Sequence, residues 1–367
     1  MPLPPLHPAF SRLAWAGRMV SPPAFQLMLR ATSHRLRPPR PVPYPPRLDR
    51  RQAAVLAAGA AGPHQRATLL REARSGPMPT IVLGGFVPDA TEALWLLRDS
   101  LLHHGSLYYF HYPRRGFSTA LLLAQLGDLV EELARVHRRP PVILAISFGA
   151  GLVLEWLRRE RDNPARSGVR GLVLVSPVTC LEDLLPAGGG RAASLLGRAL
   201  QPYVAAGFAA EARHIERSRA IFQRMFDAGA QNRTRHAVLR PDEFVRLRAA
   251  VQQTIREIDG RGACERVAAL RALTAPDPGG APLTDAPTLI LYAENEDAVL
   301  AARAPGRTAL ERAPDAGFPR GACRLVTRRG PGGPVQHASL IFHGSDYRRP
   351  LAEFYARLKS GKAKQAA

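Results

Sequence analysis

One stretch decides how the rest of the chain is interpreted: Val142-Ile143-Leu144-Ala145-Ile146-Ser147-Phe148-Gly149-Ala150-Gly151. An apolar run ends at Ser147, small residues follow, and a helical pattern begins near Leu152. This order predicts a strand, a sharp turn with Ser147 at its apex, and a helix. The residues two positions before and after the apex, Ala145 and Gly149, are small, as a turn packed against neighbouring backbone requires. An ordinary strand-to-helix turn would fit the same residues. Other segments of the chain are therefore needed to distinguish a sharp turn from an ordinary one.

Length and composition fit one large globular domain with an insertion, or two smaller domains. The chain has 367 residues, of which 46% are hydrophobic and 22% charged. No run of about eighteen apolar residues occurs, which argues against a transmembrane segment. The three cysteines are widely spaced and odd in number, which argues against a disulfide framework or a zinc site. We therefore expect a reducing, cytoplasmic location, and nothing in the sequence calls for a metal or a cofactor.

The net charge of +21 is carried almost entirely by arginine. Only Lys359, Lys362 and Lys364 among the 51 basic residues are lysines. Such a charge favours nucleic acid or anionic surfaces in general, but no helix-turn-helix, zinc-finger or RNA-binding signature directs it. We therefore interpret the arginines as solvated surface residues and expect no specific nucleic-acid partner. The sequence does not indicate an oligomeric state.

The two ends of the chain differ in composition from its middle. Residues 1–65 are rich in proline and arginine, and we expect an extended or disordered arm, because proline lacks the donor that helices and strands need. Residues 361–367 form a short basic tail.

Apolar strand patterns alternate with helical patterns in two parts of the chain, 66–178 and 286–360. The strand patterns lie at 80–83, 106–112, 142–146, 171–177, 287–293 and 323–327, and the helical patterns at 90–103, 120–137 and 349–358. Uniformly apolar strands separated by helices indicate a parallel sheet covered on both faces. We predict an α/β fold with a mostly parallel, doubly wound sheet.

The alternation stops between the strands near 171–178 and 287–293. Residues 179–285 are mostly helical in pattern, with helices expected at 191–206, 209–226, 241–258 and 263–273. Their apolar stripes are Leu195/Leu196/Leu200/Val204 and Ile221/Phe222/Met225/Phe226. These stripes need an apolar counterpart, which is either a neighbouring helix or a bound ligand.

Three segments together resemble the α/β-hydrolase family. The stretch around Ser147 is similar to its nucleophile elbow, G-x-S-x-G, with Ala145 in place of the first glycine. Gly84-Gly85-Phe86 resembles the family's H-G-x turn, with Gly for His, and the segment 113–118 resembles its D-x-R-G-x-G-x-S loop. The resemblance covers about 79–180 and 286–358. It implies that 179–285 is a cap over the active site, and that the backbone N–H groups of Phe86 and Phe148 form an oxyanion hole.

The resemblance also implies a catalytic triad in the order Ser, acid, His, each member following a strand. A serine hydroxyl is a weak nucleophile that needs a base, and the base needs an acid to orient it. Ser147 is the expected nucleophile and His337 the expected base. One family pattern, aligned on Ala293, places the acid at Glu296, and another places it at Asp297. We prefer Asp297, because aspartate has less side-chain freedom; Glu294 is a remoter candidate.

The activity that this resemblance implies is hydrolysis of a carboxylic ester through an acyl-enzyme. A thioesterase, peptidase, lactonase or acyltransferase would use the same triad, and a non-catalytic member would keep the fold for binding only. The expected partner is a small ester or thioester, with an apolar acyl chain if the stripes of the cap line its pocket.

Overall fold

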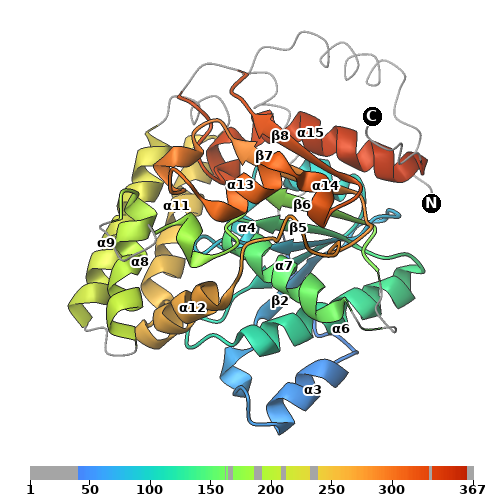
Figure 1. Ribbon diagram of the computed structural model, residues 1–367, viewed down its shortest axis with the longest axis horizontal. Helices are drawn as coiled ribbons and strands as arrows, with labels where there is room; N and C mark the ends of the chain where they lie inside the picture. The colour runs from blue at the N-terminus through green and yellow to red at the C-terminus, as the bar shows by residue number, and fades with distance from the viewer. Residues whose placement is uncertain are drawn as a thin grey trace.

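The computed structural model describes residues 40–161, 163, 168–185, 192–207, 212–231, 239–329 and 333–361. Its centre is an eight-stranded sheet with the order β1-β2-β4-β3-β5-β6-β7-β8 (Figure 1). The strands are β1 (Val42–Pro43), β2 (Thr68–Glu72), β3 (Thr80–Leu83), β4 (Leu107–His111), β5 (Val142–Ile146), β6 (Gly171–Val175), β7 (Thr288–Ala293) and β8 (Gly321–Val326).

The strands from β4 to β8 in the sheet order all run parallel, as predicted. β2 pairs antiparallel with both β1 and β4. This strand was not predicted from the sequence. Its sequence, Thr-Leu-Leu-Arg-Glu, ends in two charged residues and lacks the uniform apolarity of the buried strands. The prediction of a mostly parallel α/β sheet is confirmed.

Side chains alternate between the two faces of the sheet along each strand. Since the central strands are apolar at every position, both faces are apolar, and helices cover both of them. On one face, Ile143 and Ala145 pack in a core with α6 (Thr119–His137) and α7 (Phe148–Glu160). On the other face, Leu144 packs in a second core with α5 (Arg98–Leu102) and α15 (Leu340–Ser360). The helix expected at 90–103 is divided by a turn into α5 and the one-turn helix α4 (Ala90–Ala93).

The described part of the expected N-terminal arm is not an arm, and that part of the prediction is wrong. β1 joins the sheet, and α3 (Arg50–Ala57) packs on α6. Asp128 of α6 accepts hydrogen bonds from the backbone N–H groups of Arg51 and Gln52, each at 3.1 Å. Glu132, one turn further along α6, accepts the backbone N–H of Arg47 at 2.6 Å. Two buried acids therefore supply the acceptors that fix this segment. Residues 1–39 and 362–367 lie outside the described residues.

The predicted helical insertion is present between β6 and β7. Its helices are α8 (Leu195–Ala206), α9 (Ala212–Ala230), α11 (Pro241–Glu257) and α12 (Gly260–Ala272), and they lie together on one side of the molecule (Figure 1). We call residues 179–285 the helical insertion. Two short helices, α13 (Pro305–Arg312) and α14 (Pro314–Gly317), precede β8. Within the described ranges, no helix is long and apolar enough to cross a membrane.

Candidate active site

Ser147 occupies a strained turn between β5 and α7. Its backbone has φ 50° and ψ −116°, a conformation that costs a non-glycine residue about 1–3 kcal/mol and persists only where the surroundings impose it. The surroundings do so here: a Cβ at Gly149 would overlap the carbonyl oxygen of Gly84, and a Cβ at Gly151 would overlap that of Val178. Ala145 is fully buried between β3 and β6. The small residues around Ser147 are therefore required by the backbone that packs against them.

A continuous chain of hydrogen bonds joins Ser147, His337 and Glu296. The distance from Ser147 Oγ to His337 Nε2 is 2.9 Å, and that from His337 Nδ1 to Glu296 Oε2 is 2.5 Å. Since a carboxylate only accepts, Nδ1 carries the proton and Nε2 is left free to accept one from the serine. Glu296 is only 1% exposed, so the pair operates away from bulk water.

The prediction that Asp297 lies beside His337 is wrong. The side chain of Asp297 is 79% exposed and forms an ion pair with Arg307 at 2.9 Å. Glu296 begins a single 3₁₀ turn and points inward, and Asp297, the next residue, faces solvent. The longer glutamate side chain reaches a histidine 41 residues away, a contact that local pattern does not reveal. Glu294 is engaged elsewhere, because its Oε2 accepts the backbone N–H of Arg328 at 3.2 Å.

Ser176 is a site residue that was not predicted from the sequence. Its hydroxyl donates to Glu296 Oε1 at 2.6 Å and accepts the backbone N–H of Ala338 at 3.0 Å. It thereby ties the acid and the histidine loop to the end of β6. Its own φ is 44°, again unusual for a residue other than glycine. A serine directly after an apolar strand, next to the elbow strand, was the available signal.

The pKa of Glu296 is lower than usual in spite of its burial. Burial by itself raises that pKa, but attraction to a protonated His337 and the hydrogen bonds from His337, Ser176 and the Ala293 N–H outweigh burial. The Ala293 N–H lies 2.6 Å from Oε1. Glu296 is therefore ionised at neutral pH and suited to stabilise a protonated imidazole.

The two candidate oxyanion donors belong to residues that lie close to Ser147. Phe148 is the first residue of α7, so its N–H has no acceptor within the helix. Phe86 follows Gly85, where a Cβ would lie 3.5 Å from the Cβ of Ser147. The rings of Phe86 and Phe148 pack together with centroids 5.1 Å apart. The positions fit the expected donors, and their role stays a prediction.

Ser147 and His337 open into a cavity of about 440 Å³ between the sheet and the helical insertion. α8 contributes Leu196, α9 contributes Phe222 and Met225, and α11 contributes Ile255. No Asp, Glu, Lys or Arg occurs among the described residues that line this cavity. The apolar stripes of the insertion thus serve partly as lining and partly as packing, since Leu200 and Ile221 are buried outside the cavity.

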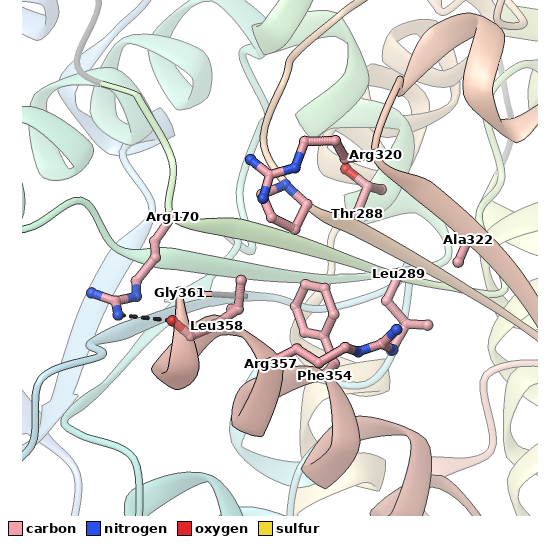
Figure 2. A pocket seen from close by; sticks show the side chains of 10 residues that line it. Arg170, Thr288, Leu289, Arg320, Ala322, Phe354, Arg357, Leu358 and Gly361 are labelled. Carbon is pink, nitrogen blue, oxygen red and sulfur yellow. Dashed lines mark hydrogen bonds between the residues drawn. The ribbon is translucent and has the colours of Figure 1, made fainter. Parts of the chain in front are cut away.

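A second cavity, of about 240 Å³, lies where β7 and β8 begin, next to the end of α15. Arg170, Arg320 and Arg357 line it, but Figure 2 shows their guanidinium groups pointing in different directions. Arg170 donates to the Leu358 carbonyl at 3.0 Å. The three charges do not converge on one point, and neither serine nor histidine occurs among the residues described as lining this cavity. We therefore place the candidate active site in the cavity at Ser147.

No group of three or more His, Cys, Asp or Glu side chains that could hold a metal ion occurs in the part of the chain that the structure describes.

Comparison with known proteins shows likeness at the level of structure. No family model matches the chain, and no curated protein matches it in sequence. An esterase from Thermogutta terrifontis matches with a TM-score of 0.51 and 14% identity, over 80% of this chain and 94% of the other. An epoxide hydrolase from Bacillus megaterium matches with a TM-score of 0.52 and 11% identity, over 81% of this chain and 98% of the other. A membrane phospholipase A, described as a bacterial virulence factor, matches with a TM-score of 0.56 and 14% identity, over 96% of this chain and 97% of the other. At these identities the likeness shows the fold.

Proposed function

We propose that this chain, which has the α/β-hydrolase fold, is a serine hydrolase that cleaves uncharged esters with apolar acyl groups. The observation that carries the proposal is the hydrogen-bonded series Ser147–His337–Glu296 opening into a cavity. Nucleophile, base and orienting acid are all within hydrogen-bond reach, which is the geometry that acyl transfer requires.

The arrangement accounts for each proton of the reaction. Ser147 Oγ attacks the acyl carbon while His337 Nε2 takes the hydroxyl proton, and the carbonyl oxygen becomes an oxyanion facing the Phe86 and Phe148 N–H groups. The ester C–O bond breaks as His337 returns that proton to the leaving alcohol, and an acyl-Ser147 remains. A water molecule then attacks the acyl carbon while His337 takes one of its protons. The bond between the acyl carbon and Ser147 Oγ breaks as His337 returns that proton to Oγ, and the carboxylic acid leaves. Glu296 stays ionised throughout and stabilises the imidazolium.

The lining of the cavity supports the substrate class. The described lining offers no Asp, Glu, Lys or Arg to pair with a ligand carboxylate or ammonium, and burying such a charge unpaired would be costly. We propose that the helical insertion acts as a cap whose α8, α9 and α11 side chains contact the acyl chain. An acyltransferase or thioesterase would use the same geometry with another acceptor or leaving group, and a cytosolic location remains our expectation.

Hydrolysis of a series of p-nitrophenyl esters tests the proposal. Ser147→Ala and His337→Ala should each abolish nearly all turnover, because triad members act as a unit. Ser360→Ala, at the exposed end of α15, is the matched control and should leave turnover unchanged. kcat/KM should rise from acetyl to medium-chain esters by up to about fourfold per methylene, the equivalent of about 0.8 kcal/mol. Turnover that survives either substitution would contradict the proposal, and a preference for acetyl would contradict the apolar acyl site.

A further inference from the structure

Arg266 is a charged side chain buried inside the protein. It belongs to α12 of the helical insertion and is only 1% exposed. Its Nη1 donates to the carbonyl of Phe86 at 3.0 Å, and its Nη2 donates to that of Pro113 at 2.9 Å. The guanidinium carbon lies 5.6 Å from the centre of the Tyr112 ring. No carboxylate forms an ion pair with it among the described residues.

A buried cation that forms no ion pair is costly, and an apolar residue of similar volume would fill the space more favourably. Burial, the largest effect, and the charge of Arg114 lower the pKa of Arg266 to about 10, while the charges of Asp89 and Asp259 act in the opposite direction. The side chain still carries its charge at neutral pH. Unlike an apolar side chain of similar volume, Arg266 donates hydrogen bonds to two backbone carbonyl groups.

One of those carbonyls belongs to the loop next to Ser147. Gly84 and Gly85 have no side chains that could fix this loop from within, so its backbone must be fixed from outside. Tyr112 Oη donates to the carbonyl of Gly84 at 2.9 Å, and Arg266 holds the carbonyl of Phe86. The peptide groups before and after the Gly85–Phe86 peptide are thus both restrained, and that middle peptide carries the Phe86 N–H.

We infer that Arg266 is a positioning residue that holds the Phe86 N–H in place as an oxyanion donor, with Tyr112 restraining the other side of the same peptide. The inference rests on the proposed function. It also assigns a second task to the helical insertion, which would fix the oxyanion loop through α12 as well as line the cavity through its other helices. Oxyanion donors act because they are held in place before charge develops, so a loosened loop should slow the chemical step more than it weakens substrate binding.

The test compares three conservative variants with the wild type. Arg266→Lys keeps the charge but lacks the planar fork that reaches two carbonyls. Tyr112→Phe removes only the hydroxyl that holds Gly84. Arg219→Lys is the matched control, because Arg219 of α9 donates to the carbonyls of Arg256 and Ile258, at 2.8 and 2.7 Å, inside the insertion.

We expect kcat for a p-nitrophenyl ester to fall about 10- to 100-fold in Arg266→Lys and Tyr112→Phe, with KM changed less than about threefold. The inhibition constant of a trifluoromethyl ketone, whose adduct with Ser147 bears an oxyanion, should rise by a similar factor. The control should keep its kcat and inhibition constant even if its melting temperature falls. If Arg266→Lys does not fold, Arg266→Gln is measured instead, and the same result is expected. Glutamine keeps an amide donor and removes the buried charge.

Two outcomes separate this inference from the proposed function. A wild-type protein without Ser147-dependent hydrolysis would overturn both. An active wild type whose Arg266 variants keep kcat and ketone affinity, or lose them no more than Arg219→Lys does, would overturn the positioning role and leave the hydrolase standing.

Discussion

Replacing Glu296 by glutamine should inactivate the site by moving the ring proton of His337 from Nδ1 to Nε2. The fold of the site should be retained. Oε1 of Glu296 accepts two donors, the Ser176 hydroxyl and the Ala293 N–H, each at 2.6 Å. Oε2 accepts one donor, His337 Nδ1. A glutamine has a single acceptor oxygen, and placing it at the Oε1 position satisfies both of those donors. Its NH₂ group then faces His337, so Nδ1 must become an acceptor and the ring proton must move to Nε2.

A histidine with its proton on Nε2 cannot take the proton of Ser147. The loss of the correct tautomer in such a triad lowers kcat by about 10⁴, which corresponds to roughly 5 kcal/mol of transition-state stabilisation. Asp297→Asn removes only an exposed ion pair with Arg307, so it should change kcat less than about threefold.

Steady-state hydrolysis of a p-nitrophenyl ester by the two variants, with melting temperatures as a folding check, measures the difference. A folded Glu296→Gln protein that keeps more than about a tenth of the wild-type kcat would refute this reasoning, because a His337 with its proton on Nε2 cannot support that much activity. Equal losses in both variants would refute it as well.

Three further predictions follow from particular contacts. Ser176→Ala removes one donor to Glu296 and the acceptor of the Ala338 N–H, so kcat should fall about 10- to 100-fold while KM is nearly unchanged; an unaltered kcat would mean that Ser176 does not position the acid. Phe222 lines both the cavity of about 440 Å³ and a neighbouring one of about 30 Å³, so Phe222→Ala should join them and shift the preferred acyl chain to greater length in a kcat/KM series. Burial and the charge of Asp89 raise the pKa of Glu92 from 4.5 to about 7, with the Thr91 hydrogen bond opposing them. The folded protein therefore binds a proton that the unfolded chain releases, and stability falls as pH rises from about 4.5 to 7; urea unfolding should show Glu92→Gln gaining up to about 3 kcal/mol over the wild type at pH 8 and nothing at pH 4.5.

The parts of the fold that depend on one segment at a time could be predicted from the sequence. The buried parallel strands are uniformly apolar because both of their faces are covered, and their positions agree with the expectation to within a few residues. The elbow was recognisable because a strained turn against neighbouring backbone tolerates only small residues at Ala145 and Gly149. β2 was missed because its side chains are only partly buried and its last two residues are charged.

What could not be predicted depends on contacts between distant residues. The proline-rich segment before α3 is fixed by Glu132, whose carboxylate lies 88 positions from Tyr44 and accepts its hydroxyl at 2.5 Å. The choice of acid failed for the same reason, because Glu296 and Asp297 are neighbours in sequence and only the fold decides which of them faces His337. Ser176 and Arg266 act on backbone groups far away in the chain, and no spacing in the sequence marks them.

The central claim is that Ser147 is a nucleophile activated by His337 and Glu296. Labelling with a fluorophosphonate probe, followed by mass spectrometry of the digested protein, tests it most directly, since the probe reacts with an activated serine and needs no knowledge of the substrate. We predict one adduct, on the peptide that contains Ser147, formed much more slowly in Glu296→Gln and at the wild-type rate in Asp297→Asn. A folded wild-type protein that is not labelled, or is labelled on another serine, would contradict the account.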